Sequence, residues 1–121
     1  MDPALAFAIN SCVNETASII VKFVGKLNEI RVFKRKCERL GKEITVFHQL
    51  LDSKREAVKT LQTLREFEAC VTRAEEFVNK CVLWNVVNIS LEVFVRHEYP
   101  SLMKKLYGLR EVFVLDSVVS F

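Results

Sequence analysis

The side chains that could carry out acid–base or nucleophilic catalysis are few in this sequence. It contains two histidines, His48 and His97, and neither has a cysteine or serine that the sequence places beside it. A catalytic histidine needs such a partner within hydrogen-bond reach. The paired acids Glu75 and Glu76 fall among basic residues on the polar side of a predicted helix, where solvated ion pairs are the simpler interpretation. We therefore expect no catalytic residues and no enzyme activity.

The four cysteines could in principle hold a metal ion or form two disulfides. They are separated by 25, 33 and 11 positions, without a CxxC pair, and this spacing does not match that of zinc ligands. Each lies in an apolar helical register, where a free cysteine behaves as a small hydrophobic side chain. We expect free thiols in a reducing cytoplasm, and neither a metal nor another cofactor. The four are Cys12, Cys37, Cys70 and Cys81.

The densest positive charge lies in RVFKRKCERLGKEI, residues 31–44. Projected at 100° per residue, its basic members fall opposite its apolar members. Glu38 lies within the basic side, four residues from both Lys34 and Lys42, where we expect it to form ion pairs. Such a face is either a solvated helix surface or a surface that adheres to anionic lipid head groups. The residues alone leave both interpretations open. The basic face comprises Arg31, Lys34, Arg35, Arg39 and Lys42.

Apolar residues recur at helical spacing along most of the chain and predict an all-α fold. Asp2 and Pro3 are typical of a helix start, and Pro100 suits the start of the last helix. The β-branched and aromatic residues of 82–97 predict an irregular or short helical connector before that helix. Four amphipathic helices favour a four-helix bundle with up-down topology. The expected helices cover residues 3–24, 28–52, 54–81 and 100–117.

The two ends of the chain are both apolar. The opening MDPALAFAI leaves little polar surface, which indicates either a buried helix or one that can insert into a bilayer or self-associate. No segment has the 18 uncharged apolar residues expected of a membrane span. The ending LDSVVSF has no polar tail, so we expect a single domain, residues 1–121, that forms the N-terminal part of a longer protein.

Three stretches of the sequence resemble one protein family. They are KRKCERLGKEI in the second expected helix, LQTLREFEACVTRAEEFVNKC in the third and YPSLMKKLYGLREVF in the last. They resemble the N-terminal four-helix domain of mixed-lineage kinase domain-like proteins, which belongs with the fungal HeLo-like and the plant resistance-type helical domains. The resemblance covers residues 10–115, and MDPALAFAI is similar to the start of fungal HeLo-like domains.

The resemblance implies a cell-death execution module. Such a bundle is cytoplasmic until a C-terminal domain or an upstream signalling protein triggers it. It then oligomerises, binds anionic phospholipids and permeabilises the plasma membrane. The resemblance assigns lipid contact to the basic face, and to Lys104 and Lys105. It assigns membrane insertion or self-association to Ala4, Leu5, Phe7 and Ile9.

A non-lytic adaptor bundle in signalling is the alternative. It would use the apolar connector around Trp84, together with the first helix, to hold a partner helix. Binding of nucleic acid is disfavoured, because the net charge is only +3 and no recognition motif is present.

Overall fold

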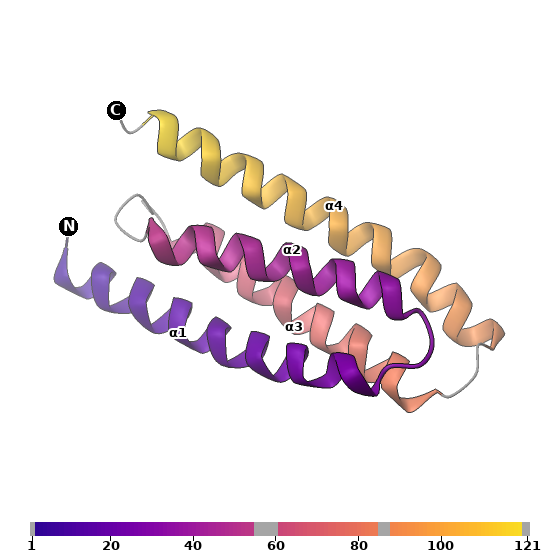
Figure 1. Ribbon diagram of the computed structural model, residues 1–121. Helices are drawn as coiled ribbons and strands as arrows, with labels where there is room; N and C mark the ends of the chain where they lie inside the picture. Colours follow the sequence, from indigo (N-terminus) through magenta and orange to yellow (C-terminus); the bar gives the residue numbers. More distant parts are fainter. Residues whose placement is uncertain (1, 55–60, 85–87, 120–121) are drawn as a thin grey trace.

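The computed structural model describes residues 2–54, 61–84 and 88–119, and in this part of the chain four long helices form a bundle (Figure 1). The all-α prediction is confirmed. The helices are α1 (Pro3–Lys26), α2 (Lys34–Ser53), α3 (Leu61–Leu83) and α4 (Ile89–Val119), with a short 3-10 helix, η1 (Leu27–Glu29), after α1.

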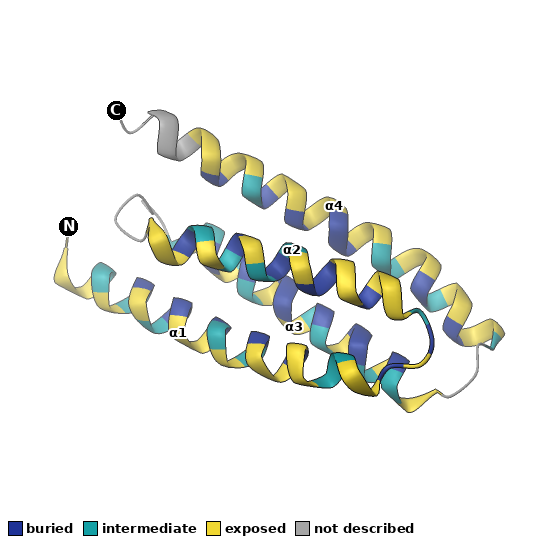
Figure 2. Cartoon of the chain, in the orientation of Figure 1, coloured by how far each residue is buried: buried dark blue, intermediate teal, exposed yellow. Residues whose placement is uncertain are grey.

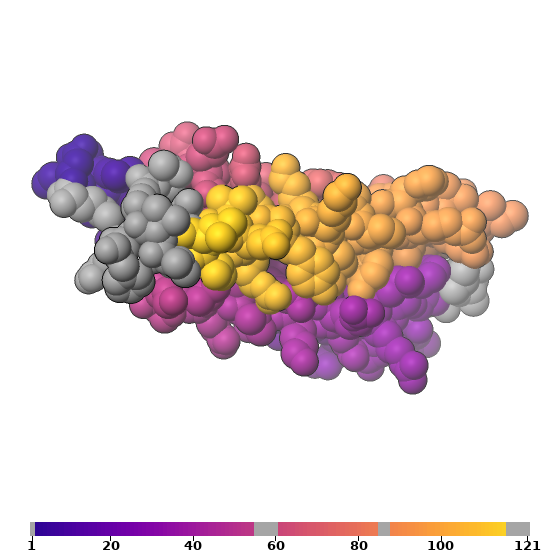
Figure 3. Space-filling view, turned by 90° about the horizontal axis from the view of Figure 1, so that it is seen from above, coloured from indigo at the N-terminus to yellow at the C-terminus, as the bar shows by residue number. Residues whose placement is uncertain are grey.

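The helices alternate in direction, as expected for an up-down bundle. Figure 1 shows α1 and α3 running one way and α2 and α4 running the other. The main packing contacts join α1 to α3 and α2, and α4 to α3 and α2. Seen from above, α4 lies between α2 and α3 (Figure 3). The order around the bundle is therefore α1, α2, α4, α3, and the consecutive helices α2 and α3 stand on opposite sides of the core.

Helix α1 begins where the sequence predicted. The Asp2 carboxylate accepts a hydrogen bond of 3.1 Å from the backbone N–H of Ala4, and Pro3 occupies the first turn, the usual arrangement of a capped helix start. The helix ends at Lys26 instead of residue 24, because Gly25 continues the helix. One face is buried, from Ile9 to Phe23.

Helix α2 begins at Lys34, so the prediction of a helix from residue 28 is wrong at its start. Ile30 has an extended backbone, and Phe33 is left-handed with φ 55°. Ile30 and Val32 are both buried, as residues two apart are when an extended segment packs one side on a core. The core thus takes up these two side chains at the expense of a turn of helix. Arg31 precedes α2, so the prediction that places Arg31 on the same helix as the other basic residues is also wrong.

Helix α4 begins at Ile89, so the prediction that the last helix starts at Pro100 is wrong by more than two turns. Asn88 caps the helix, because its side-chain oxygen accepts a hydrogen bond of 2.8 Å from the N–H of Leu91. Leu91 and Val95 are buried, and this burial outweighs the strand preference of β-branched residues. Pro100 lies inside the helix and is exposed. Residues 82, 83 and 89–97 of the predicted connector are helical.

Helix α3 ends at Leu83, two residues beyond its predicted end, and residues 55–60 of the predicted helix 54–81 lie outside the described residues. Burial follows the inner faces of all four helices (Figure 2). At the centre, the ring of Phe47 packs edge-on against Phe67 at 4.6 Å and against Phe113 at 6.1 Å between centroids. These contacts join α2, α3 and α4. All four cysteines are buried and free, as predicted.

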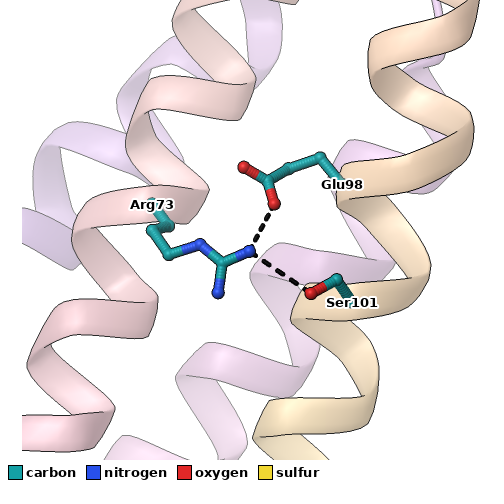
Figure 4. A network of polar contacts seen from close by, with 3 residues as sticks. All are labelled: Arg73, Glu98 and Ser101. Atoms are coloured by element: carbon teal, nitrogen blue, oxygen red, sulfur yellow. Dashed lines mark hydrogen bonds and ion pairs between the residues drawn. The ribbon is translucent and has the colours of Figure 1, made fainter.

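A polar contact ties α3 to α4 at the surface of the bundle. The Arg73 guanidinium forms an ion pair with Glu98 and donates a hydrogen bond of 3.3 Å to the Ser101 hydroxyl (Figure 4). Lys26 reaches Glu75 at 3.7 Å, and Arg110 reaches Glu43 at 3.1 Å. Each of these three cations is thus paired with an acid on a neighbouring helix.

Candidate functional site

The cations of α2 differ from these paired residues. Lys34, Arg35, Arg39 and Lys42 are all exposed, and among the described residues none of them forms an ion pair. The expected pairs of Glu38 with Lys34 and Lys42 are absent, although all three residues are described. The basic side of α2 therefore keeps its positive charge free for an external anion.

The first turn of α2 concentrates this charge where a helix tolerates it least. Lys34, Arg35 and Lys36 are its first three residues, no acid lies in the turn, and Phe33 provides no side-chain cap. The N-terminus of a helix carries a partial positive charge, so neighbouring cations destabilise it and an external anion stabilises it. Lys36 is partly accommodated, because its Nζ lies 4.9 Å from the centre of the Tyr99 ring on α4.

Arg31 is exposed just before this turn, at the same end of the bundle. The structure thus keeps it beside the other basic residues, even though it is not on the helix. The basic face is henceforth Arg31, Lys34, Arg35, Arg39 and Lys42.

Lys104 and Lys105 belong to a different surface. Lys105 lies one turn after Ser101, which accepts a hydrogen bond from Arg73 of α3, whereas Arg110 of the same helix pairs with Glu43 of α2. Lys105 therefore lies on the α3 side of α4, away from the basic face. Together with Lys104, it borders a shallow groove of about 470 Å³ over Gly108, Leu109 and Val112. The structure does not bring these lysines together with the basic face.

The four residues expected to insert or self-associate are divided by the fold. Ile9 is buried, Leu5 packs partly against the core, and Ala4 and Phe7 are exposed. Phe7 is 76% exposed, which is unusual for so large an apolar side chain. As it stands, this segment is half core and half surface.

The segment Pro3–Glu29 is long and apolar enough to cross a membrane, by length and composition only. The segment contains no run of 18 uncharged residues, because Glu15 and Lys22 interrupt its apolar sequence. Buried helices of soluble proteins meet the same criterion. Here only 28% of the apolar window is buried inside the bundle.

A second exposed apolar group lies where α3 ends and α4 begins. Leu83 is 78% exposed, Ile89 81% and Trp84 45%, and Val93 follows one turn later on α4. Sequence reasoning singled out Trp84 alone. The sequence signal for the others is the high density of apolar residues in 82–97. These residues predict an irregular or short helical connector, but their density also indicates an exposed apolar surface.

Three of the four buried thiols have a raised pKa, whereas the neighbouring Cys37 thiol lowers the pKa of Cys81. Burial and the Glu68 carboxylate, which accepts a hydrogen bond of 3.1 Å from the Cys12 thiol, raise the pKa of Cys12 to about 11. A hydrogen bond with Cys81 and burial raise the pKa of Cys37, and burial raises the pKa of Cys70. Protonated thiols neither attack electrophiles nor bind metals well. In the described part of the chain, no three metal-ligating side chains come together.

The described surface thus carries exposed cations without ion pairs and, elsewhere, exposed apolar side chains. Such groups are suited to binding a larger partner. No protein-family model, no curated protein and no solved structure matches this chain.

Proposed function

We propose that this bundle is a cell-death execution domain that binds anionic phospholipids, self-associates on the plasma membrane and permeabilises it. The observation that carries the proposal is the basic face, whose cations are exposed and have no ion pair among the described residues. Each Lys or Arg near an anionic membrane surface contributes about 1 kcal/mol of binding free energy. The resemblance of three of its helical stretches to HeLo-like bundles supports the same function.

Permeabilisation assigns a second role to α1. Phe7 and Ala4 are already exposed, but Ile9 and Phe23 are buried, so α1 has to leave the core before its whole length can enter a bilayer. Burial of each such side chain stabilises the bundle by about 1.5–3 kcal/mol. Insertion into lipid and contacts between copies offset this cost. A C-terminal domain or an upstream signalling protein would hold the cytoplasmic bundle closed until activation.

Vesicle binding and leakage test the proposal. The variant R35E/R39E removes two cations from the basic face, and K54E/R65E makes the same change of net charge at two exposed positions elsewhere. We expect wild type and K54E/R65E to sediment with vesicles containing phosphatidylserine and to release a trapped dye. R35E/R39E should bind at least about ten-fold more weakly, because two cations contribute about 2 kcal/mol. Equal leakage by both variants would contradict the proposal.

The exposed residues Leu83, Trp84 and Ile89 favour a second candidate function, that of a non-lytic adaptor that holds a partner helix. An adaptor would leave vesicles intact at every lipid composition. Its binding to an isolated apolar helix would be lost on substitution of Trp84 with alanine, whereas reversal of the basic face would have no effect.

A further inference from the structure

Four exposed apolar side chains form one corner of the bundle, which we name the apolar corner: Leu83, Trp84, Ile89 and Val93. Single exposed apolar residues are common on soluble proteins, but several together mark an interaction site. Here two aliphatic side chains about four-fifths exposed lie within six positions of each other, on either side of a tryptophan.

The apolar corner and the first turn of α2 lie at the same end of the molecule. Figures 1 and 3 both place the start of α2, the end of α3 and the start of α4 at this end. Two contacts agree with the views. Cys81, near the end of α3, raises the pKa of Cys37 in the first turn of α2 and so lies beside it, and Lys36 lies over Tyr99 of α4. Lys34 and Arg35 therefore lie at the same end of the bundle as the apolar corner.

The acids at this end of the bundle offset its cations only in part. Glu29 of η1 is exposed and reduces the local positive charge. Glu92, the acid within the first turn of α4, is paired with Arg96 at 3.0 Å. Lys80 covers the ring of Phe94, with its Nζ 4.0 Å from the ring centre, and adds another cation at the end of α3. This end of the bundle thus presents both apolar side chains and cations, and Lys34 and Arg35 form no ion pair within the described residues.

An anionic bilayer matches this combination better than a protein partner does. Tryptophan prefers the membrane interface, where its ring is apolar on one side and its N–H remains hydrated, and Lys or Arg beside it meet lipid phosphates. A stable protein interface usually takes about 20–30 residues and about 800 Å² from each partner. Four side chains at a corner are far fewer.

We propose that the apolar corner is the point at which this protein first enters the bilayer. Leu83, Trp84 and Ile89 insert among the lipid head groups, while Lys34 and Arg35 bind the phosphates beside them. This inference rests on the proposed membrane function and adds an orientation to it. The bundle stands with this end on the membrane, and residues 3–9 of α1, at the opposite end (Figure 1), point away from the bilayer on first contact. Docking and insertion are then separate steps that use opposite ends of the molecule.

The tryptophan itself is the probe for the test, because Trp84 is the only one in the chain. The protein is mixed with vesicles of phosphatidylserine and phosphatidylcholine, with or without bromine atoms on the lipid chains near the head groups. We expect the emission of Trp84 to move to shorter wavelength and to be quenched by the brominated lipids. Acrylamide in the buffer should then quench it less than in the free protein.

Two double variants test the corner as a binding element. L83S/I89S removes its aliphatic side chains, and V114S/L115S truncates two exposed aliphatic side chains near the other end of α4. We expect L83S/I89S to bind vesicles at least about ten-fold more weakly and V114S/L115S to bind like wild type, because burial of one Leu or Ile is worth about a factor of ten. All four positions are exposed, and circular dichroism checks that both variants fold.

The failure of this inference differs from the failure of the proposed function. If the protein sediments with anionic vesicles while the emission of Trp84 stays unchanged, the basic face binds lipid without the corner and the inference is wrong. If no binding to vesicles occurs, the proposed function fails and the inference fails with it. If the emission responds to an isolated apolar helix and not to vesicles, the corner is a protein-binding site and the inference is overturned.

Discussion

Gly41 of α2 is the glycine that packs against a side chain of α1, the ring of Phe23. A Cβ atom at this position would stand 2.8 Å from Cε1 of the Phe23 ring, and Phe23 is fully buried. Glycine in a helix costs about 1 kcal/mol relative to alanine. The chain thus bears a penalty in helix propensity that lets the ring of Phe23 pack against the backbone of α2.

We predict that G41A destabilises the protein although alanine is the better helix former. Overpacking of a core costs about 1–3 kcal/mol, which should exceed the gain in propensity. The matched control is G108A, since a Cβ there meets no heavy atom within 4 Å, and we expect this variant to be stabilised by up to about 1 kcal/mol. Urea unfolding measures both. A G41A protein as stable as G108A would contradict the packing argument.

Cys12 makes the stability of the fold depend on pH in the alkaline range. Its pKa rises from the ordinary value of 9.0 to about 11 in the folded state, so between these values the folded protein retains a proton that the unfolded chain has lost. The free energy of unfolding therefore contains a contribution that is complete below pH 9 and disappears as the pH rises through about 11.

We predict that wild type loses about 2 kcal/mol more stability than C12A between pH 9 and pH 11, which is the free energy of a shift of this size. Urea unfolding at several pH values measures the difference between the two proteins, in which the other titrating groups are common. A difference that is constant with pH would show that Cys12 titrates in the folded state as it does in the unfolded chain.

At the scale of the element, the first turn of α2 is unfavourable for helix stability. Its three cations oppose the helix dipole, and the turn contains no acid. We predict that R35E stabilises the bundle by about 0.3–1 kcal/mol, because a carboxylate there complements the dipole, and that the same variant binds anionic vesicles more weakly. Thermal unfolding and co-sedimentation measure the two effects.

The comparison for R35E is R39E, which removes the same charge beyond the first turn of α2. The influence of the dipole falls off within one turn, so R39E should weaken vesicle binding without a comparable gain in stability. If R35E and R39E change stability equally, the first turn holds no special cost.

Periodicity predicted which segments are helical and failed at the ends of two helices. The stripes from Ile9 to Phe23 and from Cys37 to Leu51 are buried as their spacing indicated. The start of α2 depends on the left-handed backbone of Phe33, and that of α4 on the cap from Asn88. Both are single-residue events. A pattern that averages over several turns does not detect them, and strand-forming residues concealed the first turns of α4.

The candidate site was predictable only in part, for a similar reason. The cations of α2 could be placed on one side from spacing alone, and four of the five lie on that helix. Their neighbourhood with Leu83, Trp84 and Ile89 depends on how α2, α3 and α4 meet in space. Helical spacing carries no information on which ends of separate helices come together, so the apolar corner emerged from the fold alone.

At the scale of the whole molecule, the surface that we propose to bind lipid lies apart from the part of α1 that we propose to insert first. The basic face and the apolar corner lie at one end, and the N-terminus of α1 lies at the other (Figure 1). Binding therefore needs no rearrangement of the core, whereas permeabilisation does, because Ile9 and Phe23 hold α1 to its neighbours. A variant that locks α1 in the bundle should separate the two steps.

Position 68 offers such a lock between α1 and α3. The Cys12 thiol lies 3.1 Å from a carboxylate oxygen of Glu68, so E68C places a second thiol on the turn of α3 that faces Cys12, and copper-catalysed oxidation is used to join the two sulfurs. We predict that oxidised E68C still sediments with anionic vesicles but releases no dye, since α1 cannot leave the bundle. Reduction with dithiothreitol should restore leakage. The double variant C12A/E68C, which cannot form this bridge, should leak with or without the reductant. Leakage from the oxidised single variant, with the bridge verified by mass spectrometry, would mean that α1 stays in place while the membrane opens.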